Sequence, residues 1–200
     1  MSTALKKFIE QNIEFIEQGD YQSLYHYAAM DDLVTPAQLT ELFMRIDVKP
    51  ELYMTTLVDD FARDMYGMKQ FVVPPNIEVI GNYAFGYNYD LEEVIFTTGN
   101  LDVIGDRAFT HTSIRSIILP DTVTELGPRA FSHCKNLEYV ELSSGLSILS
   151  GHMFYNSLKL ETIHYRGTMH DWNTLIDIND RWTNGSNINK VKCSDGVIEL

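Results

Sequence analysis

One stretch of the chain decides the fold: residues 118–137 read ILPDTVTELGPRAFSHCKNL. Its apolar positions return in the sequence on both sides, and the phenylalanine of each copy is the clearest landmark. These landmarks are Phe85, Phe109, Phe131 and Phe154, and the steps between them are 24 (109 − 85), 22 (131 − 109) and 23 (154 − 131) residues. A repeat of that length is typical of a solenoid in which every unit forms one coil.

Each unit combines two apolar patterns. The first has the spacing apolar-x-x-apolar-x-apolar, as in Leu137-x-x-Val140-x-Leu142, and suits a short strand whose alternate side chains point inward. The second reads apolar-Gly-x-x-Ala-Phe, as in residues 126–131, where we expect glycine to allow a sharp turn and the phenylalanines to stack as a ladder. Because one unit alone cannot bury enough apolar surface, at least three must stack.

The repeats occupy residues 68–166 as four units and a fifth strand. The expected fold class is therefore α+β: a short leucine-rich-repeat solenoid with a period of about 23 residues, flanked by a helical N-terminal domain and a C-terminal capping segment.

The same residues resemble a known family, the BspA-type (Treponema-like) leucine-rich repeat, whose pattern reads IP-x-x-V-x-x-IG-x-x-AF-x-x-C-x-x-L. Residues 118–137 follow this pattern closely, and residues 165–172 and 191–196 are similar to the segment that closes many such arrays. The last unit departs from it with Ser150 for Gly and Met153 for Ala. The resemblance implies a solenoid used for protein or surface contact, and it implies no shared catalytic activity.

The segments that flank the repeats are expected to cover the two ends of the solenoid. Residues 1–67 predict a helical domain of four short helices, near 4–18, 20–30, 35–46 and 50–66, the last with Leu57, Phe61 and Met65 inward. Such a domain would cover the first coil, whose apolar surface and strand edge are otherwise exposed. Residues 167–200 predict a C-terminal cap. It consists of a short helix capped by Thr168 and a β-hairpin over 190–200, with Trp172 and Trp182 plugging the last coil.

Composition narrows the class of partner. The chain has 28 acidic and 15 basic residues, a formal net charge of −13. Nucleic acid and anionic membranes need clustered Lys and Arg, so neither is expected as a partner, whereas a protein with a basic surface fits. The first residues carry charges where a signal peptide has none, and no segment is apolar enough to cross a bilayer. We therefore expect a cytoplasmic protein, with a cell or virion surface as the alternative.

The outward residues of the predicted strands form the candidate partner-binding surface. One column comprises Val72, Ile95, Ile118, Glu141 and His164, and the neighbouring column contributes Glu93 and Tyr139. Three β-branched residues at adjacent outward positions predict a contiguous apolar patch, which needs an explanation. Three explanations remain open: the patch binds a partner, the N-terminal helices fold over it, or β-propensity alone selected these residues.

No motif in the sequence points to catalysis. His111 and His133 occupy the same place in successive units and could share a metal, but nothing supplies a third and fourth ligand at a fixed spacing. His170 and Asp171 stand beside each other without a nucleophile placed by motif. Phosphate loops and metal-spaced cysteine pairs are also missing from the sequence. We therefore expect no catalytic residue, no cofactor and no metal.

The sequence thus favours a non-enzymatic protein–protein interaction module that uses its outward sheet face, its acidic helical domain or both. A narrower interpretation is an inhibitor of the kind carried by phages and mobile elements. Its negative charge would complement the basic cleft of a bacterial defence protein. The competing hypotheses are a homo-oligomeric structural or surface component and, last, an enzyme with a cleft between the helices and the first coils. The oligomeric state and the partner are left open.

Overall fold

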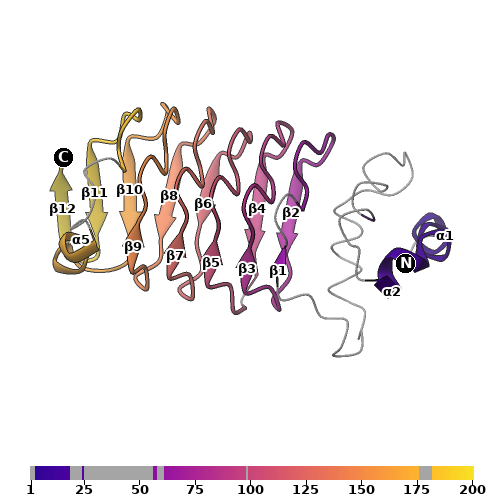
Figure 1. Cartoon of the computed structure of the whole chain (residues 1–200). Helices are drawn as coiled ribbons and strands as arrows, with labels where there is room; N and C mark the ends of the chain where they lie inside the picture. The colour runs from indigo at the N-terminus through magenta and orange to yellow at the C-terminus, as the bar shows by residue number, and fades with distance from the viewer. Residues whose placement is uncertain (1–2, 19–23, 25–55, 58–60, 98, 176–181) are drawn as a thin grey trace.

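The repeats form a linear stack of coils in a computed structural model of the chain. The structure describes residues 3–18, 24, 56–57, 61–97, 99–175 and 182–200. Each coil contributes one strand of three or four residues and one of two residues, so the stack has two strand rows (Figure 1). The longer strands are β2 (Gln70–Val73), β4 (Glu93–Phe96), β6 (Ser116–Ile118), β8 (Tyr139–Leu142) and β10 (Thr162–Tyr165). The shorter strands are β1 (Thr56–Leu57), β3 (Val79–Ile80), β5 (Val103–Ile104), β7 (Glu125–Leu126) and β9 (Ile148–Leu149).

Neighbouring coils are joined by parallel pairing in register. The short strands form one sheet in the order β1-β3-β5-β7-β9, in which Leu126 lies opposite Leu149. The long strands form two sheets, β2-β4 and β6-β8-β10, the second continuing into the C-terminal hairpin. Because the period matches the register, equivalent residues of successive coils stand in columns. The predicted solenoid of leucine-rich repeats is confirmed.

A ladder of phenylalanines fills the centre of the stack, as the sequence predicts. The rings of Phe85 and Phe109 are 5.1 Å apart, those of Phe109 and Phe131 5.4 Å, and those of Phe131 and Phe154 6.0 Å, and each pair is stacked. All four side chains are fully buried. The ladder therefore runs through the coils as one continuous apolar core.

The glycines of the repeat serve close approach between coils. A Cβ on Gly127 would lie 2.5 Å from the amide nitrogen of Asp106 in the preceding coil, and a Cβ on Gly105 would lie 2.9 Å from that of Asn82. Neither glycine has positive φ. Glycine thus avoids a Cβ clash and provides the space that adjacent backbones need, and the turn that follows it does not require a left-handed glycine.

The positive φ angles fall instead on large side chains at two places in every turn that follows a short strand. One column comprises Tyr83, Arg107, Arg129 and His152, and the other comprises Asp64, Tyr87, His111, His133 and Asn156. Their φ angles lie between 52° and 62°. The left-handed conformation is unfavourable for such residues, so the coil geometry is strong enough to impose it.

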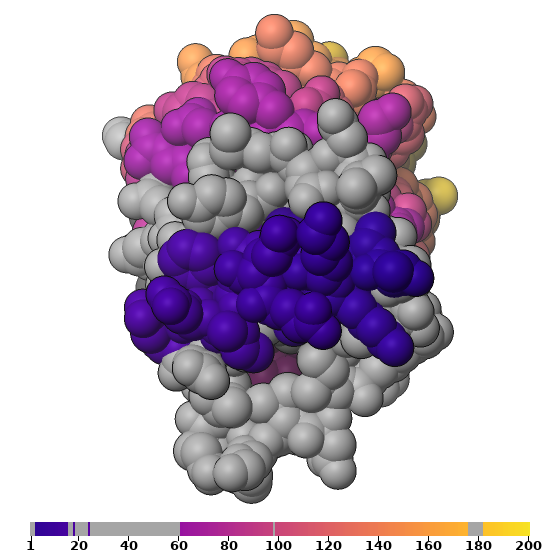
Figure 2. Space-filling model, turned by 90° about the vertical axis from the view of Figure 1, so that its right-hand side faces the viewer, coloured from indigo at the N-terminus to yellow at the C-terminus, as the bar shows by residue number. Residues whose placement is uncertain are grey.

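The predicted helix over residues 4–18 is present as two helices, α1 (Thr3–Gln11) and α2 (Ile13–Gln18). They separate at Asn12, whose side-chain amide donates to the Phe8 carbonyl at 2.8 Å. The backbone amide of Asn12 also donates to this carbonyl, at 3.1 Å, so the side-chain bond adds to the helical one. Figure 2 looks onto this end of the molecule and shows α1 and α2 across its front. Their role as the cover of the first coil stays a prediction, and the helices expected near 20–30 and 35–46 lie outside the described residues, Leu24 apart.

The prediction of a helix from residue 50 to residue 66 is wrong for its C-terminal half. Thr56–Leu57 is strand β1, and its register with Val79–Ile80 makes it part of the short-strand row. The amides of Ala62 and Asp64 then donate to the carbonyls of Ala84 and Gly86, as in the later coils. Phe61 and Ala62 reverse the Ala-Phe order of the repeat, and this reversal hid the coil in the sequence. The division of the chain into domains at residues 67 and 166 stays a prediction.

The C-terminal segment closes the stack with the elements that the sequence predicts. Helix α5 (Met169–Leu175) begins with a reciprocal pair of bonds: the Asp171 amide donates to the Thr168 hydroxyl at 3.1 Å, and the Thr168 amide donates to the Asp171 carboxylate at 2.9 Å. Buried Trp172 packs between Tyr165 and Trp182. Strands β11 (Lys190–Cys193) and β12 (Gly196–Glu199) form the hairpin, with β11 parallel to β10.

We expect Phe109→Ala to lower the free energy of unfolding by about 3–5 kcal/mol, because it removes a ring that contacts both neighbouring coils. Urea denaturation measures the loss. The matched control is Ile148→Ala on β9, whose side chain is 48% exposed, and it should change stability by no more than about 0.5 kcal/mol. Equal losses for the two variants would contradict the ladder as the centre of the core.

Candidate functional site

The outward side of the long strands, here called the long-strand face, carries all seven residues predicted for partner binding. In the register of the strands, Val72 lies opposite Ile95, and Glu141 lies opposite both Ile118 and His164. Glu93 and Tyr139 lie opposite Gln70 and Ser116 in the neighbouring column. Ile95 is 38% exposed and Ile118 53% exposed, whereas Val72 is half-buried. Whether this face binds a partner stays a prediction.

The face is interrupted between β4 and β6. In the described chain these strands belong to different sheets. The connection from β4 to β5 has one residue more than its counterparts, because Val94 and Ile104 are 10 positions apart (104 − 94) while the equivalent Ile117 and Leu126 are 9 apart (126 − 117). The connection from β5 to β6 is one residue shorter, so the coil keeps the 23-residue length of its neighbour (117 − 94 and 140 − 117). Gly99 lies in the longer connection against the backbone of Pro75, where a Cβ would collide. The interruption of the long-strand row thus coincides with this irregular coil.

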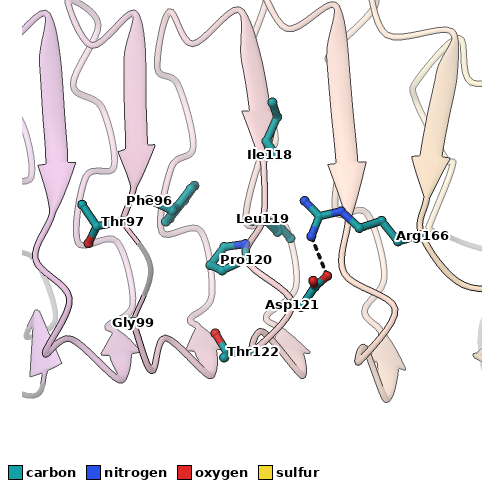
Figure 3. A pocket seen from close by; sticks show the side chains of 9 residues that line it. All are labelled: Phe96, Thr97, Gly99, Ile118, Leu119, Pro120, Asp121, Thr122 and Arg166. Atoms are coloured by element: carbon teal, nitrogen blue, oxygen red, sulfur yellow. Dashed lines mark hydrogen bonds and ion pairs between the residues drawn. The ribbon is translucent and has the colours of Figure 1, made fainter.

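A groove of about 380 Å³ lies at this interruption, below the exposed isoleucine of β6 (Figure 3). Phe96, Ile118 and Pro120 give it apolar walls. At its other side Arg166, which directly follows β10, reaches back past one whole coil to an ion pair with the Asp121 carboxylate. The long-strand face thus has an apolar recess bordered by a fixed charge pair.

A polar cluster lies beside the groove. The Tyr139 hydroxyl donates to Glu141 Oε2 at 2.7 Å, and Arg166 Nε donates to Glu141 Oε1 at 2.6 Å. The His164 ring lies 4.6 Å from the Tyr139 ring. Of the predicted residues, the structure therefore joins Tyr139, Glu141 and His164 into one cluster around Arg166. Ile95 and Ile118 form the apolar part.

These contacts explain the acid–base properties of the cluster. The hydrogen bond from Arg166, and then that from Tyr139, lowers the pKa of Glu141. The bond to Glu141 raises the pKa of Tyr139, and burial lowers that of His164. At neutral pH the cluster consequently presents a carboxylate, a neutral phenol and a guanidinium in fixed positions. Such an arrangement offers ordered hydrogen-bond donors and acceptors at the surface.

The structure adds residues that the sequence interpretation missed. Arg166, Phe96, Pro120 and Asp121 complete the groove, although the sequence interpretation singled out only outward positions within the strands. The signal for Arg166 is its position one residue after the fifth strand. The structure also shows that the Asp171 carboxylate caps α5, so it serves the helix beside the exposed His170. Within the described ranges, no three His, Cys, Asp or Glu residues gather as metal ligands would.

The repeat pattern, the coil register and the closing segment together define a leucine-rich-repeat protein. Residues 58–176 match the BspA type leucine rich repeat region in six copies, and the chain belongs to that family. The match begins ten residues before the first predicted unit (68 − 58), which agrees with the coil formed by β1 and Phe61. Repeats of this family generally mediate binding between proteins.

One solved structure shows the same fold. The T. pallidum leucine rich repeat protein is similar with a TM-score of 0.55 and 21% identity, covering 60% of this chain and 55% of its own. The pneumococcal vaccine antigen PcpA gives a TM-score of 0.46 and 15% identity, over 70% of this chain and 42% of that one. The chain thus spans about half the length of these relatives or less. No curated protein matches it.

Among the described residues, the helices are too short or too polar to cross a membrane.

We expect Glu141→Gln to lower stability by about 1–2 kcal/mol at neutral pH, because it weakens the bonds from Arg166 and Tyr139. The depressed pKa means that the wild-type advantage is present above the ordinary value of 4.5 and is lost as the pH falls below it through the lowered pKa. Urea denaturation across this range should therefore show the gap between variant and wild type closing in acid. Exposed Glu125 on β7 provides the control, Glu125→Gln. A gap independent of pH would argue against the charged cluster.

Proposed function

We propose that this protein is a non-enzymatic module that binds another protein through its long-strand face. The observation that carries the proposal is the exposed pair Ile95 and Ile118 beside the groove at the interruption of the sheet. Exposed apolar side chains in a recess with a polar rim are characteristic of protein interfaces. The membership of a repeat family that generally binds proteins supports the same conclusion.

The polar cluster supplies specificity in this proposal. Glu141 and Arg166 are held by each other, by Tyr139 and by Asp121, so a partner meets charges that are already ordered. Ordered groups lose less conformational entropy on binding than free side chains do. Apolar contacts at Ile118 would provide affinity, and the cluster would fix the orientation of the partner.

The net charge of −13 favours a partner with a basic surface. An inhibitor that occupies the basic cleft of a bacterial defence protein is the narrower form of this proposal. Its capture should weaken as added salt screens the charges, since exposed ion pairs are screened over about 8–10 Å at physiological salt. Capture that is indifferent to salt would leave the apolar face as the sole determinant and remove the inhibitor hypothesis.

A homo-oligomeric structural component would use the same face against a second copy of the chain. Light scattering of the purified protein separates the two functions, because only self-association raises the particle mass in the absence of other proteins. A monomer that captures a different protein supports the binding module, whereas a stable oligomer that buries Ile118 supports the structural component.

We expect the double substitution Ile95→Asp and Ile118→Asp to reduce capture of a specific partner by more than about tenfold, because it places charges in the apolar centre of the interface. Proteins retained from lysate of the native cell are identified by mass spectrometry for wild type and variants. The matched control is Ile148→Asp, equally exposed but on the short strand β9. Unchanged capture by a folded double variant would show that this face does not bind; adding Val72→Asp extends the test to the first coil.

A further inference from the structure

A second groove, unrelated to the long-strand face, lies on the turns that follow β5 and β7. Its volume is about 240 Å³. Two guanidiniums, Arg107 and Arg129, come from one left-handed column, and two imidazoles, His111 and His133, come from the other. Two successive coils therefore contribute the same pair of groups, and the four side chains border one depression.

Buried hydroxyls lie among these four groups. Thr110 and Ser132 line the groove although they are 2% and 1% exposed, and their hydroxyl oxygens are 2.8 Å apart. Thr110 Oγ1 also lies 3.1 Å from Nδ1 of His111. Thr110 Oγ1 also lies 3.1 Å from the Ser132 carbonyl oxygen, so the two hydroxyls bond within the protein, and the cationic or cation-forming groups are the donors left for a ligand.

The imidazoles are held in place. The rings of His111 and His133 stack at 4.2 Å, and Tyr87 stacks on the other side of His111 at 4.7 Å. The side-chain amide of Asn156 donates to Nδ1 of His133 at 3.0 Å, which leaves the proton of a neutral ring on Nε2. A neutral His133 therefore offers Nε2–H as a donor, and protonation of Nδ1 requires the Asn156 side chain to turn its amide oxygen toward the ring.

Basic residues dominate around the groove, although the chain as a whole is acidic. Residues 68–167 contain seven Lys and Arg, and three of them, Arg107, Arg129 and Lys135, lie at or beside the groove. Arg107 is paired with Asp106 at 2.7 Å. Within the described residues, Arg129 has no carboxylate at ion-pair distance, and no acidic side chain lines the groove. The site consequently has an unneutralised guanidinium.

The coil geometry does not require these residue types. The equivalent left-handed positions of the neighbouring coils carry Tyr83 and Tyr87 on one side and His152 and Asn156 on the other. Glycine or asparagine would adopt this backbone more readily than arginine or histidine. Among the described coils, only the two central ones carry an arginine and a histidine together at these two positions, which favours a ligand over the demands of the fold.

We infer that this groove binds a tetrahedral oxyanion, the phosphate or sulfate group of a free ion or of a monoester. Two guanidiniums and two imidazoles provide more donors than one carboxylate accepts, whereas an oxyanion with three free oxygens can use them. Tyr87 and Tyr155 stand at the ends of the groove and would contact an aromatic group attached to the ester oxygen.

Binding should depend on pH through the two histidines. Burial, their mutual repulsion and Lys135 lower the pKa of His111, and burial, Lys135 and Arg129 lower that of His133. Arg107, itself paired with Asp106, also borders the groove, and Tyr87, Tyr155 and Asn156 are the remaining contacts of the rings. A bound dianion favours the protonated imidazoles, so affinity should rise as the pH falls below the ordinary value of 6.5.

Sulfate is the first probe, because its own charge stays constant over this range of pH. We expect millimolar sulfate to shift the imidazole NMR signals of His111 and His133 and to leave those of His164 and His170 in place. Affinity should be about threefold to tenfold higher near pH 5.5 than near pH 8. Arg129→Gln should weaken binding about tenfold, while Arg115→Gln, which alters an exposed arginine paired with Glu92, should not.

Inorganic phosphate and phenyl phosphate then distinguish the two sources of the group at one pH. Tighter binding of phenyl phosphate indicates an aryl monoester that uses Tyr87 and Tyr155, and equal binding indicates the free oxyanion. Thermal unfolding checks that both arginine variants are folded, and the histidine signals of the wild type test the site without any substitution. Absence of shifts at His111 and His133, or equal affinity for wild type and a folded Arg129→Gln, would overturn the inference.

Discussion

The structure depends on the stacking of one coil on the next. A single coil has too few apolar side chains to offset the entropy lost by fixing its backbone, so the stability resides in the contacts between coils. Two of these contacts recur throughout: parallel strand pairing and the phenylalanine ladder through Phe109 and Phe131. Both require successive coils to have nearly the same length. That requirement arranges the surface residues in columns and limits where the pattern can vary.

Most of the fold could be predicted because the same constraint acts at every unit. The period located the Phe ladder, and the alternation of the strands indicated which side of Ile118 and Glu141 faces outward. The prediction of the fold failed where other residues than those of the repeat pattern fill the same place in the stack. In the first coil Phe61 precedes Ala62, and the bulky ring packs against Phe71 and Phe85 from the place that alanine has elsewhere. A pattern that requires Ala before Phe cannot recognise it.

The candidate site was accessible to sequence analysis only in part. Outward strand positions follow from alternation, so Tyr139, Glu141 and His164 could be placed on one face. Arg166 could not, because its contact with Asp121 spans 45 residues and depends on the path of the chain after β10. The groove lies at the coil whose longer β4–β5 connection contains Gly99, and the missing pairing between β4 and β6 is evident only when adjacent coils are compared.

The hairpin at the C-terminus has a consequence for how such a molecule can change in length. Strand β12 runs antiparallel to β11, so it offers the wrong direction to any further parallel coil. Gene duplication of a unit can therefore not extend the array beyond the hairpin, and an added coil must lie before β11. Each in-frame copy would move the two ends apart by about 5 Å, the spacing of neighbouring strands, and would carry its own pair of outward residues into the columns.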